Sequence, residues 1–252
     1  GCMQTMGYSF TSKESHALFG IDANILLKNP LNEATSVLRS TLYPGLLSQL
    51  QYNLQNGAHE ARFFELSNVF SAVPDAPLEV AERQVLASVW TGSLGKDSWQ
   101  NTHGAPLDVF YLKACMTKVL KRLGIWEHVE WRIGTLSYLH PYQQGAFYAG
   151  EDRILELGLL HPEIARSYDF AKDVFLLQVE CSALVPLLVR PSYKKIVLFP
   201  HNRRDLSLMV PLGVDFESIY EVLRSKKCNR HLINQFIFDI YDGDNVQDGC
   251  YS

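Results

Sequence analysis

The residues of this chain that could do chemistry are histidines, cysteines and a few charged side chains set among aromatic ones. Two Leu-His-Pro triplets make His140 and His161 a candidate metal pair. Each histidine precedes a proline at a predicted turn, and neither has a cysteine or carboxylate cluster nearby to complete a zinc site. The five cysteines, at 2, 115, 181, 228 and 250, show no C-x-x-C spacing, which favours reduced thiols. We therefore predict structural histidines and no metal site.

The sequence lacks the motifs of the commonest nucleophilic, phosphate-binding and zinc enzymes. It contains no G-x-S-x-G, no G-x-x-x-x-G-K-[ST], no G-x-G-x-x-G and no H-E-x-x-H. Its 252 residues, 47% of them apolar, suit one large or two ordinary globular domains. No run reaches the roughly 18 apolar residues of a membrane span, and no basic-then-apolar start resembles a signal peptide. We expect a cytoplasmic protein without membrane contact.

One charged pair lies in a predicted strand, Ala61 to Phe70. Side chains alternate between the two faces of a strand, so Arg62 and Phe64 face away from Phe63 and Glu65. An arginine and a glutamate beside buried aromatic residues need polar partners. This strand is therefore the first place to look for a site.

The segment before that strand predicts a helix. Pro44 fits the first helical turn, and Gly57 fits the left-handed position just past the end. Tyr43, Leu47, Leu50 and Leu54 recur at spacings of four, three and four, which places them on one helical stripe. Such a stripe suits either a core helix or a subunit interface, and periodicity alone favours the core.

The residues of this segment carry a resemblance to a known family. The run Asn-Pro-Leu-x-Glu-x-x-Ser-Val-Leu-Arg-x-x-Leu-x-Pro-Gly-Leu-Leu from Asn29, followed by Arg-x-Phe-Glu-x-x-x-Val-Phe from Arg62, resembles the beta subunit of bacterial-type phenylalanyl-tRNA synthetase. The resemblance continues through Asp-Val-Phe-Tyr-Leu-Lys at 108–113, both Leu-His-Pro triplets, and Phe-Pro-x-x-Arg-Arg-Asp-Leu ending at Leu206. It covers nearly the whole chain in the family's order.

The resemblance implies a non-catalytic module. A class II synthetase site needs a strand arginine for the ATP phosphates, and a glycine-rich strand and helix with a second arginine. Arg62 and Glu65 look like a degenerate form of the first element, and the sequence shows no counterpart of the second. We expect no catalytic residues and no cofactor in this fragment. In the assembled α2β2 enzyme, the resemblance implies that the alpha subunit carries out the chemistry with ATP and magnesium.

Two partner surfaces follow from the same resemblance. The helix stripe, formed by Tyr43, Pro44, Leu47, Leu50 and Leu54, is expected to pack against the alpha subunit, and its apolar side chains could drive self-association of the isolated fragment. Residues 190–231 hold nine basic and four acidic side chains, a balance that suits either a polyanion or a solvated charged face. The expected contacts to tRNA(Phe) are Arg203, Arg204, Lys226, Lys227 and Arg230. Arg204 and Asp205 could instead form an ion pair.

The predicted fold class is α+β, with a class II synthetase-like antiparallel sheet flanked by helices over residues 1–189. Strand patterns at 83–91, 145–160 and 174–181 and a helix capped by Asp108 and ending at Gly124 support this. Residues 190–252 begin with a linker, Arg190-Pro-Ser192. Strand Asp205 to Val210, helix Phe216 to Lys226 and strand His231 to Tyr241 then predict the first half of a ferredoxin-like anticodon-binding domain.

We interpret the chain as a fragment of the beta subunit of phenylalanine–tRNA ligase that is inactive alone. One alternative is a non-enzymatic protein- or RNA-binding paralogue on the same scaffold. Another is an unrelated small-molecule enzyme with a cleft at Arg62, Glu65 and His140. A ligand-sized pocket at those three residues would favour the enzyme.

Overall fold

The computed structural model describes residues 1–21, 25–73, 80–95, 105–189, 193, 200, 202–225, 232–241, 246 and 250–251. The chain divides into two compact units, Gly1–Ser192 and Tyr193–Ser252. The predicted linker 190–192 lies outside the described residues. Among those residues no helix is long and apolar enough to cross a membrane.

A seven-stranded sheet organises the first unit. Its spatial order is β1 (Met3–Gln4), β4 (Ala61–Ala72), β5 (Val80–Thr91), β11 (Val174–Glu180), β10 (Asp152–Leu160), β9 (Leu139–Ala149) and β8 (Glu130–Ile133). All neighbours are antiparallel except β1 and β4. The strand patterns predicted at 61–70, 83–91 and 145–160 are confirmed, and they form the antiparallel pairs β4–β5 and β9–β10. Gly150 at the second turn has a φ of 61°, which glycine adopts without strain.

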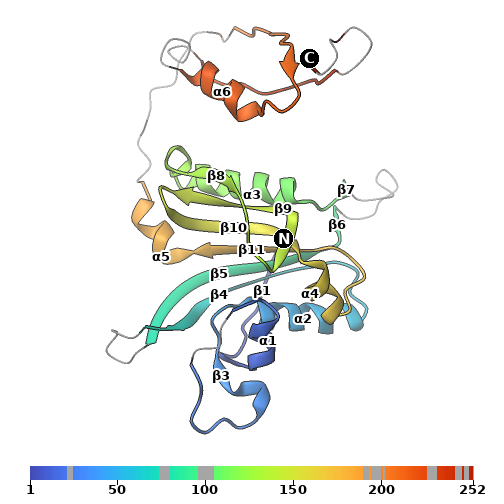
Figure 1. Cartoon of the computed structure of the whole chain (residues 1–252), viewed down its shortest axis with the longest axis vertical. Coiled ribbons are helices and arrows are strands. Elements are labelled where there is room, and N and C mark those ends of the chain that lie inside the picture. Colours follow the sequence, from blue (N-terminus) through green and yellow to red (C-terminus); the bar gives the residue numbers. More distant parts are fainter. Residues whose placement is uncertain are drawn as a thin grey trace. The chain divides into compact units, whose positions relative to one another are not determined.

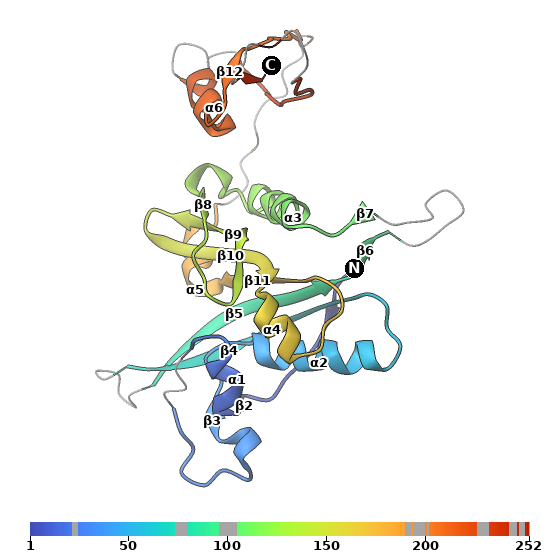
Figure 2. The ribbon, with the colours of Figure 1, turned by 45° about the vertical axis from the view of Figure 1, so that its right-hand side comes forward.

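Helices cover both faces of this sheet (Figures 1 and 2). On one face lie α1 (Lys13–Ala17), α2 (Tyr43–Gln55) and α4 (Pro162–Ser167), and on the other lies α3 (Val109–Arg122). The predicted helix ends are confirmed: Pro44 occupies the first turn of α2, and Asp108 accepts a hydrogen bond from the Tyr111 backbone N–H at the start of α3. Gly57 and Gly124 adopt positive φ angles just beyond the two helices.

Two apolar cores lie on the two faces. The first joins α2 to β4 and β5 through residues such as Leu46, Leu50 and Val89, and the second joins α3 to β10 and β11 through residues such as Leu120 and Phe175. Burying one such side chain contributes about 1.5–3 kcal/mol. The apolar alternation of the strands therefore fixes both helices to the sheet.

Short elements complete the first unit. They are β2 (Phe10–Thr11) paired with β3 (Val37–Leu38), β6 (Ser93–Leu94) paired with β7 (Ala105–Pro106), α5 (Cys181–Leu184), and the 3-10 turns Glu33–Thr35, Trp126–His128 and Val185–Leu187. The pairing of β2 with β3 holds the N-terminal segment beside the start of α2.

The second unit departs from the prediction. It contains α6 (Phe216–Arg224), capped by Asp215 as predicted, and one short pair of β12 (Val210–Pro211) with β13 (Cys250–Tyr251). Residues 205–209 and 232–241 form no strand, so the strands predicted at 205–210 and 231–241 are wrong over these residues. An apolar run becomes a strand only where a neighbour pairs with it and a layer covers it, and here side chains such as Leu206 and Phe238 remain exposed. The ferredoxin-like topology stays unconfirmed.

Candidate functional site

Arg62 and Glu65 project from opposite faces of β4, as their spacing predicted. The Arg62 guanidinium donates to the Ser93 carbonyl oxygen at 2.6 Å and lies 5.6 Å from the centre of the Trp90 ring. Trp90 belongs to the core under α3. Glu65 points to the other face, so these two residues do not form one site.

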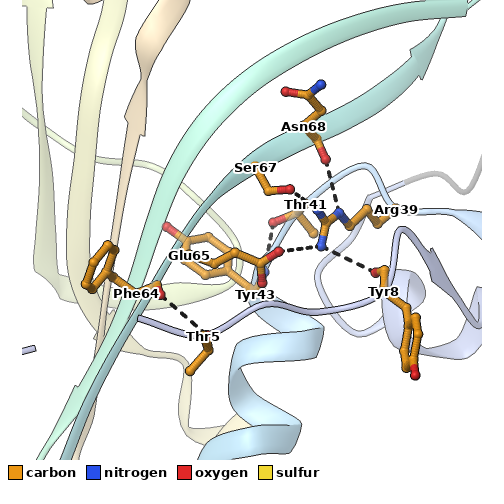
Figure 3. A network of polar contacts seen from close by, with 9 residues as sticks. All are labelled: Thr5, Tyr8, Arg39, Thr41, Tyr43, Phe64, Glu65, Ser67 and Asn68. Atoms are coloured by element: carbon orange, nitrogen blue, oxygen red, sulfur yellow. Dashed lines mark hydrogen bonds and ion pairs between the residues drawn. The ribbon is translucent and has the colours of Figure 1, made fainter. Parts of the chain in front are cut away.

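Glu65 belongs to a polar clamp around Arg39, shown in Figure 3. One of its carboxylate oxygens accepts a hydrogen bond from Arg39 Nη1 at 2.8 Å, and the two side chains are 6% and 3% exposed. Arg39 also donates to the carbonyl oxygens of Asn68 and Tyr8 and to the Ser67 hydroxyl. The clamp ties the N-terminal segment to β4, which makes Glu65 a structural residue.

Arg39 lies in the run that carries the resemblance, but no role for it was predicted from the sequence. A single arginine next to the apolar pair Val37 and Leu38 was the available signal. Such an arginine, when buried, requires a carboxylate or several carbonyl oxygens nearby. No sequence rule identified Glu65 as that partner, because the two residues are adjacent only in space.

The sheet face under α2 changes from apolar to polar along the strands. At the α2 end, a cross-strand row on β4, β5 and β11 is apolar: Phe63, Val89 and Leu176. The next row on this face includes β10 and carries Glu65, Ala87, Gln178 and Glu156. Beyond it come Ser67, Val85 and Glu180. Side chains of direct cross-strand partners share a face, so the polar residues gather at one end.

A pocket of about 400 Å³ lies at this polar end. Its lining includes Ser71, Arg83, Tyr138, Arg153, Gln178 and Glu180. Arg83 and Glu180 form an ion pair at 2.9 Å, and Glu180 also accepts a hydrogen bond from Gln178 Nε2 at 3.0 Å. The alternative cleft at Arg62, Glu65 and His140 is not what the structure shows, since the described lining of this pocket contains none of the three.

Glu156 lies buried beside the pocket, with 2% of its residue surface exposed. Its Oε1 accepts hydrogen bonds from the hydroxyls of Tyr138, at 2.5 Å, and Tyr43, at 3.2 Å. Arg153 lies 3.2 Å from Oε2. Burial raises the pKa of Glu156, and the Arg153 charge and the two hydroxyls partly offset that rise. Burial and the Glu156 charge raise the pKa of both tyrosines.

Comparison with known proteins identifies the family. Residues 1–181 match the model described as "Phenylalanyl tRNA synthetase beta chain CLM domain". The chain belongs to this family. A phenylalanine–tRNA ligase beta subunit of Yersinia pestis is 30% identical over 255 residues, covering all of this chain and 31% of that protein. One from Listeria monocytogenes serotype 4b is 28% identical over 249 residues, covering 98% of this chain and 30% of that protein.

Solved structures confirm the fold class of the first unit. Two pyrrolysyl-tRNA synthetase structures from Desulfitobacterium hafniense superpose with TM-scores of 0.53 and 0.55 at 13% and 12% identity. Each match covers 73% of this chain, and 60% and 62% of the two synthetase chains. The large, mostly antiparallel sheet flanked by helices is therefore a class II synthetase fold. The chain spans about a third of the length of its curated beta-subunit relatives.

The beta-chain module does not present the helix stripe that the sequence predicted as a subunit interface. Tyr43, Leu47 and Leu50 are buried in the first core, Pro44 is buried as well, and Leu54 packs partly buried against that core. A side chain already covered by its own sheet is not available to another subunit. Burial therefore corrects the interface assignment of this stripe and the route to self-association through it. The outer side of α2 is Gly45, Ser48 and Tyr52, all exposed.

The predicted tRNA contacts of this family member are only partly described. Arg203 pairs with Asp205 at 3.0 Å and lies 5.9 Å and 5.5 Å from the rings of Phe236 and Phe238. Arg204 is exposed, so the ion pair considered for Arg204 and Asp205 involves its neighbour instead. Lys226, Lys227 and Arg230 lie outside the described residues.

The two candidate metal histidines have local partners instead. His161 Nδ1 accepts a hydrogen bond from the Glu163 backbone N–H and caps α4. His140 Nδ1 accepts one from the Tyr142 backbone N–H. Over the part of the chain that the structure describes, no three His, Cys, Asp or Glu side chains are grouped to hold a metal ion.

Proposed function

We propose that this chain is the catalytic-like part of a phenylalanine–tRNA ligase beta subunit and serves assembly and tRNA binding instead of catalysis. The observation that carries the proposal is the family match over residues 1–181. On this proposal the assembled ligase uses ATP and magnesium to charge tRNA(Phe) in the cytoplasm. The chemistry belongs to the alpha subunit.

The arrangement of charges supports the absence of catalysis. Arg62 faces the α3 core, where the Ser93 carbonyl oxygen and the Trp90 ring engage it. In the pocket on the other face, Arg83 is neutralised by Glu180, and Arg153 by Glu156. A nucleotide triphosphate needs an excess of positive charge. This pocket has no such excess among its described residues.

The outer side of α2 is our proposed contact for the alpha subunit. Gly45 and Ser48 are small, and a side chain added at Gly45 would meet no atom within 4 Å. Small residues let a second helix approach closely, and Tyr52, 67% exposed, offers an aromatic anchor next to them. The contact proposed here lies opposite the buried stripe.

The tRNA contact is proposed for the exposed arginines of the second unit. Arg203 and Arg204 present guanidinium groups, and Arg203 lies beside two aromatic rings. Guanidinium and aromatic groups together suit phosphates and stacked bases of RNA. Such binding should weaken steeply as salt rises.

A co-purification experiment tests the assembly proposal. The chain is mixed with a bacterial phenylalanine–tRNA ligase alpha subunit, and the mass of the mixture is measured in solution. Gly45→Arg and Tyr52→Arg are expected to weaken association at least about tenfold, since a buried unpaired charge is costly at an interface. Tyr142→Arg, on an exposed tyrosine of β9, is the control. If the unaltered chain does not bind the alpha subunit, this proposal is wrong and the alternative, a non-enzymatic binding paralogue on the same scaffold, replaces it.

The catalytic part has its own test. The chain alone, given ATP, phenylalanine and tRNA, is expected to form no aminoacyl-tRNA. Turnover by the chain alone would contradict the assignment of the chemistry to the alpha subunit. The same assay with the alpha subunit added separates support of catalysis from catalysis itself.

A further inference from the structure

Two buried acceptor atoms near the polar pocket, Gln178 Oε1 and Glu156 Oε2, receive no hydrogen bond from the described residues. Glu156 lies behind the lining, where its Oε2 is 3.2 Å from the Arg153 guanidinium. Glu156 and Gln178 are direct cross-strand partners on β10 and β11, and Gln178 lines the pocket. Buried acceptors in native proteins are almost always met by a donor. A ligand with several N–H donors on one atom would serve this position.

The mouth of the pocket offers hydrogen-bond donors in place of acceptors. The side chains of Arg83 and Arg153 are 44% and 36% exposed, and each contacts one carboxylate of the protein. A guanidinium has five N–H donors in a fork that suits carboxylates. One carboxylate contact leaves part of each fork to bind a second carboxylate.

The charges and the size narrow the ligand further. Two arginines and two glutamates balance one another, which favours a ligand without net charge over a polyanion. The volume of about 400 Å³ lies at the small end of ligand sites, which span about 300–1,000 Å³. Ile21 and Leu136 add apolar lining.

We propose that this pocket binds a small zwitterion of amino-acid size, with a primary ammonium group, a carboxylate and a short aliphatic group. The ammonium donates to Gln178 Oε1 and Glu156 Oε2. The carboxylate accepts from Arg83 and Arg153, and the aliphatic group contacts Ile21 and Leu136. The site lies on the sheet face opposite Arg62.

Three matched probes test the charge pattern on the whole chain. L-leucine carries both charged groups, 3-methylbutylamine lacks the carboxylate, and 4-methylpentanoate lacks the ammonium. Binding is measured by titration calorimetry and by the ligand-dependent rise in Tm. Leucine is expected to bind at least about tenfold more tightly than either analogue, because each analogue makes only one of the two sets of proposed polar contacts.

Two pocket variants and one control locate the site. Gln178→Leu removes the buried acceptor at similar volume, and Arg83→Gln removes one guanidinium at the mouth. Each is expected to weaken leucine binding at least about tenfold, whereas Arg132→Gln, with 38% exposure on β8, should leave the Kd within about twofold. Arg83 is exposed enough that its variant tests the proposal even if Gln178→Leu unfolds.

Several results would overturn the proposal. They are no leucine binding at about 10 mM, where a millimolar Kd would saturate the site, equal binding of the three probes, or equal effects of Arg83→Gln and Arg132→Gln. In those cases water molecules, and no ligand, donate hydrogen bonds to Glu156 Oε2 and Gln178 Oε1. The experiment uses no alpha subunit, so its failure leaves the proposed assembly function untouched.

Discussion

Two buried ionic clusters on the same sheet face differ in completeness. In the Arg39–Glu65 clamp, all three guanidinium nitrogens donate to oxygen atoms at the sheet or the N-terminal segment. In the Glu156 cluster, one oxygen accepts two tyrosine hydroxyls, while the other accepts no hydrogen bond from the described residues. A complete cluster holds structure, and an incomplete one beside a pocket is a candidate for ligand binding.

The two clusters also differ in where their residues lie in the sequence. The clamp lies in the sequence run by which the family is recognised, yet its residues face inward and bind only the chain itself. The pocket residues Arg83, Arg153 and Glu180 lie outside that run. The charged residues of that run therefore keep the fold, whereas the charged residues of the pocket come from other strands.

The largest expected effect comes from opening the complete cluster. Arg39→Met leaves the Glu65 carboxylate buried without its cation, and breaking a buried pair in this way costs about 3–5 kcal/mol. Urea denaturation would measure the free energy of unfolding. The double variant Arg39→Met/Glu65→Met is the control and should recover most of the loss. If the single variant costs under about 1 kcal/mol, the clamp does not hold the N-terminal segment.

A smaller loss of stability is expected when a hydrogen bond of the incomplete cluster is removed. Tyr138→Phe removes the 2.5 Å hydrogen bond to Glu156 Oε1, and losing one donor to a buried acceptor costs about 1–3 kcal/mol. Tyr43 continues to donate to the same oxygen, which keeps the loss at the lower end. Thermal unfolding of Tyr138→Phe and of Tyr148→Phe, whose ring lies 4.8 Å from the Arg132 guanidinium, provides the comparison. Equal Tm values for the two variants would contradict the role of Tyr138.

Local patterns predicted most of the first unit. Capping by Asp108, proline in the first turn of α2 and the alternation in β4 and β5 are determined by neighbours in sequence, and the structure confirms them. The second unit shows the limit of this approach. Alternating apolar residues near Leu206 and Phe238 satisfied the strand pattern, but a strand also requires a partner that no local rule supplies.

The candidate site was less predictable than the fold. The periodicity of α2 correctly placed Tyr43, Leu47 and Leu50 on one stripe, but it did not determine whether their own sheet or another subunit covers them. The pocket depends on pairings such as Glu156 with Gln178, which are set by strand order. Those two residues are distant in sequence and become neighbours only in the folded sheet.

Acid should act on the incomplete cluster through Glu156. The pKa of Glu156 is raised in the fold, so the folded state binds its proton more readily than the unfolded chain. The favourable contribution of the protonated form is fully present below the unfolded pKa, near 4.3, and is lost as pH rises through the folded value. Glu156→Gln should remove this dependence. Denaturation from pH 4 to pH 7 measures it, with Glu65→Gln as the control for the complete cluster.

The smallest expected effect is at His16, next to the clamp. There the free energy of unfolding should fall as the pH is lowered, opposite to the dependence expected from Glu156. His16 is fully buried; its Nε2 accepts the Ser40 backbone N–H at 2.8 Å, and its Nδ1 lies 3.3 Å from the Ser12 carbonyl oxygen. Burial lowers the pKa of His16, and the Ser12 contact partly offsets this. The neutral ring therefore stabilises the fold above the unfolded pKa, near 6.5, and this contribution is lost as pH falls through the folded value.

A protonated Nε2 would face the Ser40 N–H donor directly, whereas the amide oxygen in His16→Gln could accept that bond at every pH. Denaturation at pH 7.5 and pH 5.5 should show a larger loss for the unaltered chain than for His16→Gln, and parallel losses would mean that His16 stays neutral or that Ser40 finds another acceptor.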